Sequence, residues 1–345
     1  MARLRFLLAG LGNRGRQWAA ILAAHPDAAL AAAVDPDAAR RESFAAAHPG
    51  VPSFAELAQG LDAGGIDAVL LATPPDGHLA QARLVFAAGL PLLAEKPLSL
   101  DLAEAVEIVG LAARHRVPLA VGLNFRYLPV SVALRDALAR RVVGEPGFGQ
   151  FTYQRNRDGR QPRLNKYPLT MRHPMMLEQS IHHLDLIRHC YAREVVGVAC
   201  RTWNPAWSMY AHDSNVSCLL TLEDGLEVDY LGTWTGGWNE LRFEWRTDCA
   251  GGVVIQRQLF SDLALARTGE SALTQVPLAH AEPFRDDSAA LLAAFVAAVA
   301  SGVPPPCGGK DHLRTLALCF AAIESAESGR RVDVAEFAAR HGVAA

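Results

Sequence analysis

Apolar residues in the first part of the chain come in short, almost continuous runs separated by longer Ala-rich stretches. The runs cover residues 5–9, 28–34, 66–72, 92–94 and 118–123. A strand covered on both faces lacks polar alternation, which is typical of parallel sheets. Helices are expected in between, at residues 16–24, 38–47, 78–88 and 102–114. This alternation predicts an α/β domain with a doubly wound parallel sheet and a ligand crevice at the carboxyl ends of its strands.

The pattern changes after residue 124 to shorter strand-like segments separated by turn residues. Strands are expected at residues 149–156, 195–203, 216–222, 226–235, 240–247 and 252–256. Asp224-Gly225 predicts a two-residue hairpin, and residues 250–252 predict a second turn. One long helix is expected within residues 168–191, and two more near 288–300 and 311–328.

These patterns predict two domains. Residues 1–123 form the α/β domain, and residues 124–345 form an α+β domain with a large, mainly antiparallel open sheet. We expect ligand and substrate to meet in the crevice between them. The last helices of the chain could pack back on the first domain.

Composition narrows the class of protein. The chain has 345 residues, 50% of them hydrophobic and 20% charged, which is typical of a folded globular enzyme. A net charge of -3 gives no general attraction to nucleic acid or to an anionic membrane. No apolar run approaches the roughly 18 residues of a membrane helix. The six scattered cysteines form no CxxC pair and favour reduced thiols, so we expect a cytoplasmic protein.

A glycine motif, Gly10-Leu11-Gly12-Asn13-Arg14-Gly15, follows the first predicted strand. Its glycines permit a tight turn, close approach of a pyrophosphate and close helix–strand contact. GxGxxG alone is an unspecific signal, but Asp35 ends the next strand at the expected interval of about 20 residues. Asp35 is expected to accept hydrogen bonds from the adenosine ribose and to repel a 2′-phosphate. The motif therefore predicts a Rossmann-type dinucleotide site that prefers NAD to NADP, a preference that the nearby Arg40 and Arg41 weaken.

Further motifs follow along the chain. They are Thr73-Pro74-Pro75 with His78, Glu95-Lys96-Pro97, Asn124-Phe125-Arg126-Tyr127, His182-His183-Leu184-Asp185, and a tail around residues 321–330. Their order and spacing resemble the Gfo/Idh/MocA family (glucose–fructose oxidoreductase, inositol dehydrogenase and rhizopine-catabolism proteins) across nearly the whole chain. The resemblance implies an NAD(P)-dependent dehydrogenase acting on CH–OH groups.

Lys96 is the first candidate catalyst. It ends the fourth predicted strand, and the resemblance implies that this lysine contacts the reacting hydroxyl and carries its proton. A surface lysine after a strand is the alternative. Glu95 is expected to support the cofactor site. The residues expected to bind cofactor are Gly10, Gly12, Asn13, Arg14, Gly15, Asp35, Thr73, Pro74, His78, Glu95 and Lys96.

A polar stripe marks the long helix of the second domain. Glu178, His182, Asp185 and His189 follow i, i+4, i+7, i+11 spacing and share one helical face. The resemblance implies that His182 binds or polarises the substrate hydroxyl and that Glu178 replaces a more usual aspartate. Asp185 is expected to orient His182. A solvated polar stripe is the alternative.

The expected site therefore has two sets of residues. The catalytic residues are Lys96, His182 and Glu178, and the substrate-binding residues are Arg126, Tyr127, Arg163, Glu178, His182 and His183. A zinc or iron site made of Glu178, His182, His183 and Asp185 is disfavoured because neighbouring helical residues point about 100° apart, and no metal is expected.

Two further features leave alternatives open. The basic residues between Arg155 and Arg172 could recognise an anionic substrate, or could form a solvated loop or subunit contact. Trp203, Trp207, Trp234 and Trp238 could stack on sugars, but a subunit interface is favoured, because the family commonly oligomerises through this sheet. A homodimer or homotetramer through the second-domain sheet is expected, with no nucleic acid or membrane partner.

The favoured function is an NAD-dependent oxidoreductase that moves hydride to or from a secondary alcohol of a sugar, cyclic polyol or related hydroxylated compound, acidic ones included. Two alternatives remain: a redox-neutral, NAD-assisted lyase or glycosidase, and a non-catalytic NAD-binding sensor or regulator.

Overall fold

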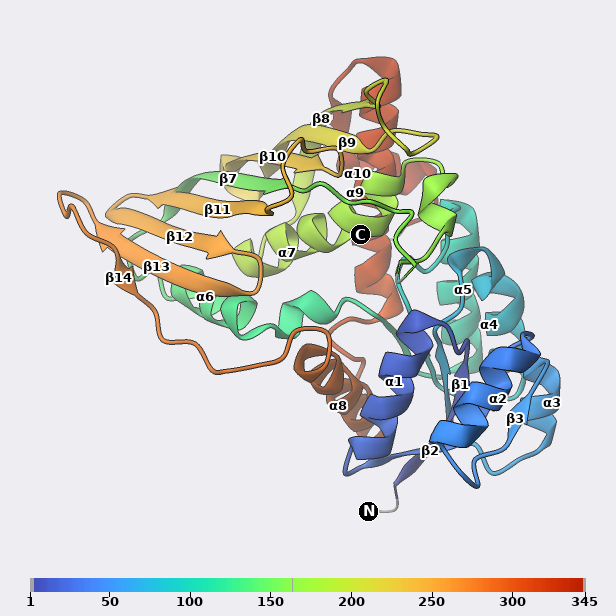
Figure 1. Cartoon of the computed structure of the whole chain (residues 1–345). Helices are drawn as coiled ribbons and strands as arrows, with labels where there is room; N and C mark the ends of the chain where they lie inside the picture. The colour runs from blue at the N-terminus through green and yellow to red at the C-terminus, as the bar shows by residue number, and fades with distance from the viewer. Residues whose placement is uncertain (1–2, 163, 344–345) are drawn as a thin grey trace. The chain divides into compact units, whose positions relative to one another are not determined.

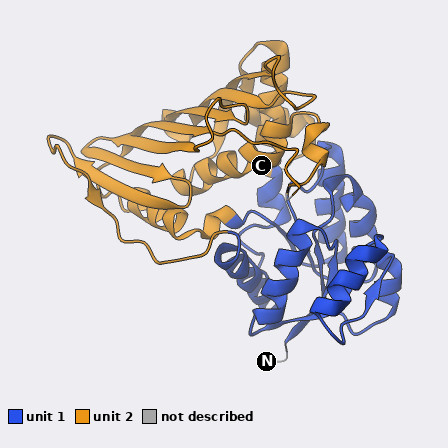
Figure 2. Cartoon of the chain, in the orientation of Figure 1, with its two compact units in different colours: residues 1–124, 284–313 blue, residues 125–283, 314–345 orange. Residues whose placement is uncertain are grey.

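A computed structural model describes residues 3–162 and 164–343 and divides into two compact units (Figures 1 and 2). Unit 1 comprises residues 1–124 and 284–313, and unit 2 comprises residues 125–283 and 314–345. The chain therefore returns to unit 1 after leaving it. Residues 284–313 cluster with the first unit rather than with the rest of the expected second domain.

Unit 1 is built on a six-stranded sheet in the order β3-β2-β1-β4-β5-β6. Every neighbouring pair is parallel. The strands are β1 (Leu4–Ala9), β2 (Ala28–Val34), β3 (Ser53–Phe54), β4 (Ala68–Leu71), β5 (Leu92–Ala94) and β6 (Leu119–Val121). This confirms the predicted doubly wound sheet, and the order reverses direction between β1 and β4, where such sheets bind ligands.

Helices cover this sheet. They are α1 (Asn13–Ala24), α2 (Ala38–Ala47), α3 (Leu57–Asp62), α4 (His78–Ala87), α5 (Leu102–His115) and α8 (Asp286–Ser301). The returning helix α8 packs on the same core, with the rings of Phe6 and Phe295 6.1 Å apart at their centroids. Both side chains are fully buried. The amphipathic pattern of α8 predicts a helix but does not specify the sheet on which it packs.

Unit 2 contains a nine-stranded sheet in the order β14-β13-β12-β11-β7-β10-β9-β8-β15. All its pairs are antiparallel except the parallel pair of β7 and β10. The strands are β7 (Pro146–Gln154), β8 (Val195–Trp203), β9 (Asn215–Leu222), β10 (Glu227–Thr233), β11 (Arg242–Cys249), β12 (Gly252–Gln258), β13 (Ser261–Arg267), β14 (Thr274–Gln275) and β15 (Val332–Asp333). The mainly antiparallel second sheet is confirmed.

The hairpin predicted at Asp224-Gly225 is also confirmed. Both residues have positive φ, 63° and 78°, the backbone that a two-residue hairpin turn requires. Other elements had no expected counterpart, among them α3, β13 and the helix α6 (Pro129–Ala139).

The long helix expected within residues 168–191 is present, but it starts only near Met175 and its first part is π-helical rather than α-helical. The structure has a 3₁₀ turn (Tyr167–Leu169), a π-helical turn (Met175–Ser180) and then α7 (Ile181–Tyr191). The remaining helices of the chain are α9 (Gly309–Ser328) and α10 (Val334–Arg340). Within the described ranges, no helix is both long and apolar enough to cross a membrane.

Candidate functional site

The glycine turn of unit 1 fits a dinucleotide. Gly10 has φ +92°, and a Cβ there would lie 2.7 Å from the carbonyl oxygen of Ala72. A Cβ on Gly15 would overlap the carbonyl oxygen of Gly10, so α1 approaches the turn closely only because this residue is glycine. Gly12 caps α1 without a side chain, which leaves the helix N-terminus open to an anion.

Gly15→Ala tests this packing. The added methyl group must push α1 away from the turn, so we expect the variant to lose NAD binding by at least tenfold and to unfold at lower temperature. Calorimetric titration with NAD and a thermal melt measure the two effects. Gly50→Ala is the control for alanine at a glycine, since a Cβ there meets nothing within 4 Å, although its positive φ costs some stability.

Asp35 ties the end of β2 to the glycine turn. Its side chain is buried and accepts hydrogen bonds from the backbone N–H of Leu11 (2.7 Å) and of Asp37 (2.9 Å). The guanidinium of Arg40 lies 3.5 Å from Asp35 Oδ2. The carboxylate therefore has a structural role before any cofactor binds, and its contact with the ribose stays a prediction.

Arg14 joins the glycine motif to the Glu-Lys-Pro motif. Its Nε donates to Glu95 Oε1 at 2.6 Å, and Trp18 Nε1 donates to the same oxygen at 2.6 Å. Burial alone would raise the pKa of the Glu95 carboxyl, but Arg14, the Trp18 N–H and Lys96 together outweigh burial and hold that pKa below its usual value. Glu95 is therefore an ionised, fixed side chain directly before Lys96, which is partly exposed after β5.

The returning segment adds polar residues that the sequence motifs did not reveal. Ser288 Oγ accepts a hydrogen bond from Arg14 Nη2 at 3.0 Å, and Asn124 Nδ2 donates to Asp287 Oδ2. Burial raises the pKa of the Asp287 carboxyl. Residues more than 160 positions apart thus meet beside the cofactor motifs, and no local pattern marks Asp287 or Ser288 as partners of this region.

His78 is a structural residue. It is buried, and its ring nitrogens lie 3.1 Å from the carbonyl oxygens of Leu98 and Thr73. Burial lowers the pKa of its imidazole. His78 therefore holds the Thr73-Pro74 turn against the segment after Lys96, and its contact with cofactor stays a prediction.

Glu178 and His182 lie on consecutive elements of unit 2. Glu178, in the π-helical turn, accepts a hydrogen bond from the Tyr167 hydroxyl at 2.8 Å. His182, on α7, stacks on Phe125 with ring centroids 4.2 Å apart and planes 19° apart. The Phe125 ring in turn meets Phe260 edge-on at 5.8 Å. Both polar groups are held by aromatic neighbours, and Tyr127 lies nearby in sequence on the same 3₁₀ turn as Phe125.

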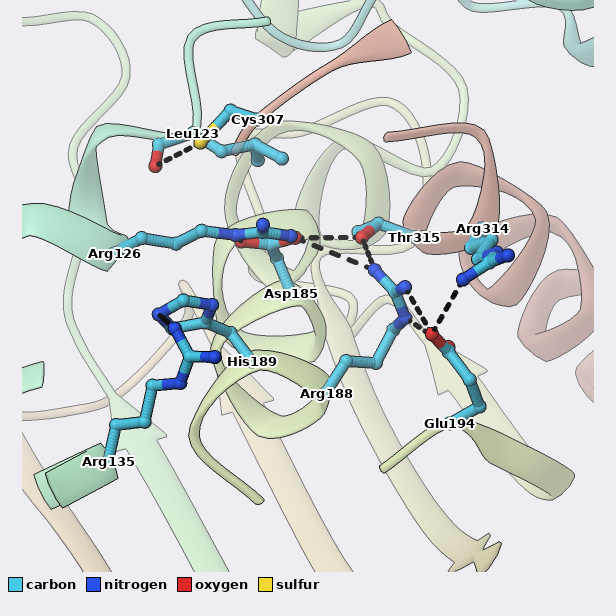
Figure 3. A network of polar contacts seen from close by, with 10 residues as sticks. All are labelled: Leu123, Arg126, Arg135, Asp185, Arg188, His189, Glu194, Cys307, Arg314 and Thr315. Carbon is cyan, nitrogen blue, oxygen red and sulfur yellow. Dashed lines mark hydrogen bonds and ion pairs between the residues drawn. The ribbon is translucent and has the colours of Figure 1, made fainter. Parts of the chain in front are cut away.

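Asp185 does not orient His182 as expected; its partner is Arg126 (Figure 3). The guanidinium forms a bidentate pair with the carboxylate, with Nε 2.7 Å from Oδ2, and both side chains are buried. Thr315 donates to Asp185 Oδ1 at 2.8 Å, and Arg188 donates to Thr315 Oγ1 at 2.6 Å. This network fastens α7 to α9 and to the turn that carries Arg126. Arg126 is therefore a structural cation here rather than a substrate ligand.

His183 also differs from expectation. Its side chain has no exposed surface and lies between Phe151, Tyr153 and Tyr230. Burial lowers the pKa of its imidazole to about 3, so it is neutral. A side chain in this position cannot contact a bound substrate without leaving the core. His183 is therefore a core residue rather than a substrate ligand.

Two cations of the basic segment make internal contacts. The Arg157 guanidinium lies over the Trp234 ring at 4.3 Å and donates to the Tyr210 hydroxyl at 3.1 Å. Lys166 Nζ donates to three backbone carbonyl oxygens, including that of Arg160 at 3.0 Å. Arg163 lies outside the described residues. These contacts stabilise the loop and give Arg157 and Lys166 structural roles, whereas the role of the other arginines of the segment stays open.

Four tryptophans of unit 2 differ in their exposure to solvent. Trp234 is buried, whereas Trp203, Trp207 and Trp238 are exposed. Among the described residues, no three His, Cys, Asp or Glu side chains gather in a way that could hold a metal ion.

Residues 4–123 match the model of the GFO_IDH_MocA family, described as "Oxidoreductase family, NAD-binding Rossmann fold". The inositol 2-dehydrogenase of Rhizobium meliloti (strain 1021) is 26% identical over 96% of this chain and 99% of its own. The D-apiose dehydrogenase of Paraburkholderia graminis is 28% identical over 81% of this chain and 76% of its own.

Solved structures share the fold. An oxidoreductase from Agrobacterium radiobacter, in complex with NAD+, L-tartaric acid and magnesium, has a TM-score of 0.88 at 22% identity, over 97% of this chain and 99% of its own. Residues 4–123 thus carry the NAD-binding Rossmann domain of the Gfo/Idh/MocA oxidoreductase family, and relatives of that family are similar to most of the rest of the chain.

Proposed function

We propose that this protein is an NAD-dependent dehydrogenase of secondary alcohols in sugars or cyclic polyols. The observation that carries the proposal is the arrangement of unit 1: a glycine turn shaped for a dinucleotide after β1, with the fixed Glu95 and then Lys96 at the carboxyl end of β5 in the same parallel sheet. Similarity to inositol and apiose dehydrogenases supports an alcohol substrate.

Each chemical role has a candidate residue. Bound NAD supplies the hydride acceptor for oxidation of the alcohol carbon. Lys96 Nζ takes the hydroxyl proton or returns it in the reverse direction. His182 donates or accepts a hydrogen bond at that oxygen, and the Glu178 carboxylate accepts hydrogen bonds from other hydroxyls of the substrate. Glu95 and Arg14 hold the backbone on which Lys96 stands.

A neutral substrate fits the charges better than an acid. Recognition of a carboxylate commonly uses an arginine fork. Two cations expected for that purpose have other partners, since Arg126 binds Asp185 and Arg157 binds Tyr210. The Glu178 carboxylate would repel an anionic substrate and attract hydroxyl donors. We therefore place inositols and uncharged sugars ahead of sugar acids.

A substrate panel tests the proposal. Purified protein is incubated with inositols, aldoses and sugar acids, with NAD or NADP, and absorbance of the reduced cofactor is followed. We expect reduction of NAD with neutral polyols or sugars at rates well above those with sugar acids. Consumption of substrate without net cofactor reduction would favour a redox-neutral lyase or glycosidase. Tight NAD binding without turnover of any compound would favour a sensor.

A further inference from the structure

The chain departs from α-helical geometry immediately before α7. Residues Met175–Ser180 form a π-helical turn, in which the backbone N–H of Ile181 donates to the carbonyl oxygen of Met176, five residues back. Such turns are rare and are found frequently at functional sites. Glu178 lies inside this turn, so whatever holds the turn also sets the position of the Glu178 carboxylate.

A chain of four hydrogen bonds, two of them buried and two partly buried, reaches the turn. The Tyr153 hydroxyl donates to Gln179 Oε1 (3.4 Å), and Gln179 Nε2 lies 3.1 Å from His183 Nε2. His183 Nδ1 lies 2.9 Å from the Tyr230 hydroxyl, which donates to Ser180 Oγ at 2.7 Å.

The donors and acceptors of this hydrogen-bond chain can be assigned in one consistent order. Because the Tyr230 proton points to Ser180, the Tyr230 oxygen accepts from His183, which must carry its proton on Nδ1. His183 Nε2 then accepts from the Gln179 amide. If the imidazole were protonated, its Nε2–H and the Gln179 Nε2–H would be two donors facing each other. The neutral state that burial imposes on His183 is therefore the state that this chain requires.

Two members of this hydrogen-bond chain lie on the sheet. Tyr153 lies on β7 and Tyr230 on β10, the two neighbouring parallel strands. The hydrogen bonds reach Gln179 and Ser180, the two residues that follow Glu178. Gly232 leaves room for the contact, since a Cβ there would overlap the Tyr230 hydroxyl. The π-helical turn is thus fastened to the sheet at the residues next to Glu178, through the side chain of His183.

We propose that this hydrogen-bond chain, with His183 at its centre, is a positioning device that fixes Glu178 for substrate. The inference rests on the proposed function, in which Glu178 accepts hydrogen bonds from the substrate hydroxyls. His183 and Tyr230 act through the backbone of the turn and are positioning residues, without contact to substrate.

Tyr230→Phe removes the central hydroxyl and keeps the ring in the core. We expect kcat/KM for the alcohol to fall on the order of tenfold, as for loss of a buried hydrogen bond, with the dissociation constant for NAD unchanged. If this variant fails to fold, His183→Asn tests the same chain with the same expected result. Its amide can still donate toward Tyr230 but is too short to reach Gln179.

Tyr191→Phe is the matched control. Tyr191 also places a buried hydroxyl between α7 and the sheet, 2.7 Å from Thr247 Oγ1 and 3.1 Å from Trp245 Nε1, but it contacts no residue of the π-helical turn. It should lose comparable thermal stability and keep the kinetic constants of the wild type. Equal kinetic effects of Tyr230→Phe and Tyr191→Phe would overturn the proposal.

A double-mutant cycle with Glu178→Gln separates positioning from general damage. If the chain acts through Glu178, Tyr230→Phe adds little to the loss that Glu178→Gln already causes. Fully additive losses would overturn the positioning role and leave the proposed function intact. Wild-type activity of Glu178→Gln would instead overturn the assignment of Glu178 in the proposed function, and the positioning role with it.

Discussion

Replacing Lys96 by alanine should lower kcat by about 10²–10⁴-fold while NAD still binds. Lys96 follows β5 directly and is partly exposed, next to the buried and ionised Glu95. Removing the amine deletes the group that takes the hydroxyl proton in the proposed reaction, but leaves the glycine turn and Asp35 as they are. Steady-state kinetics with the best alcohol of the substrate panel, together with calorimetric titration of NAD, measure the two properties separately.

Lys310→Ala is the control for this experiment. Lys310 is an exposed lysine in the first turn of α9, so its loss changes the net charge by the same amount. We expect wild-type kinetics from it. A Lys96→Ala enzyme with wild-type kcat would rule out the proton role of Lys96. A variant that loses NAD binding as well would show that Lys96 supports the cofactor rather than the chemistry.

The strands and the glycine turn of the first unit could be predicted from the sequence because each depends on residues that are close together along the chain. Buried parallel strands give continuous apolar runs, and the Gly10–Gly15 turn requires glycine for steric reasons that act within a few residues. The Asp224-Gly225 hairpin follows from the same kind of constraint. In each case the neighbouring residues along the chain determine the backbone.

The partners of charged side chains were not predictable in this way. Asp185 lies three residues after His182, and helical spacing favours contact between them, yet Asp185 binds Arg126 from an element 59 positions away. The choice depends on how α7 packs, which the sequence pattern of α7 does not contain. The hydrogen bond from Arg14 to Ser288 likewise depends on how a distant helix, α8, packs.

The π-helical turn also changes the expected spacing of the polar residues on the helix of unit 2. Periodicity with 3.6 residues per turn places Glu178, His182 and Asp185 on one continuous face. A turn with i→i−5 bonding before Ile181 changes that register, and hydrogen bonds to Tyr153 and Tyr230 on the sheet reach Gln179 and Ser180 in this turn. Only the strand pairing of β7 and β10 brings those two tyrosines together, so a helix-based interpretation could not anticipate it.

Arg126→Gln should destabilise the protein by about 3–5 kcal/mol, because it leaves the buried Asp185 carboxylate without its main counter-charge. Asp185 is almost completely buried, and its remaining partners are the Thr315 hydroxyl at 2.8 Å and the Arg188 guanidinium at 3.8 Å. A thermal melt should show a decrease in Tm of about 4–7 °C. Arg83→Gln is the control, since it breaks an exposed ion pair with Glu107 and should cost about 0–1 kcal/mol.

The pH dependence gives a second measure of the same pair. Burial opposes ionisation of Asp185, but Arg126, Arg188 and the Thr315 hydroxyl together outweigh burial and hold the pKa of the carboxyl below its usual value. A lowered pKa in the folded state stabilises the protein above the pKa of the unfolded chain, about 3.9, and this stabilisation is lost as pH falls through the folded value. Arg126→Gln should therefore unfold in acid at a higher pH than the wild type, and the double variant Arg126→Leu/Asp185→Leu should regain much of the lost stability at pH 7. If Arg126→Gln melts at the same temperature as Arg83→Gln, the pair contributes no more than a surface contact, and α7 must be held by its apolar packing alone.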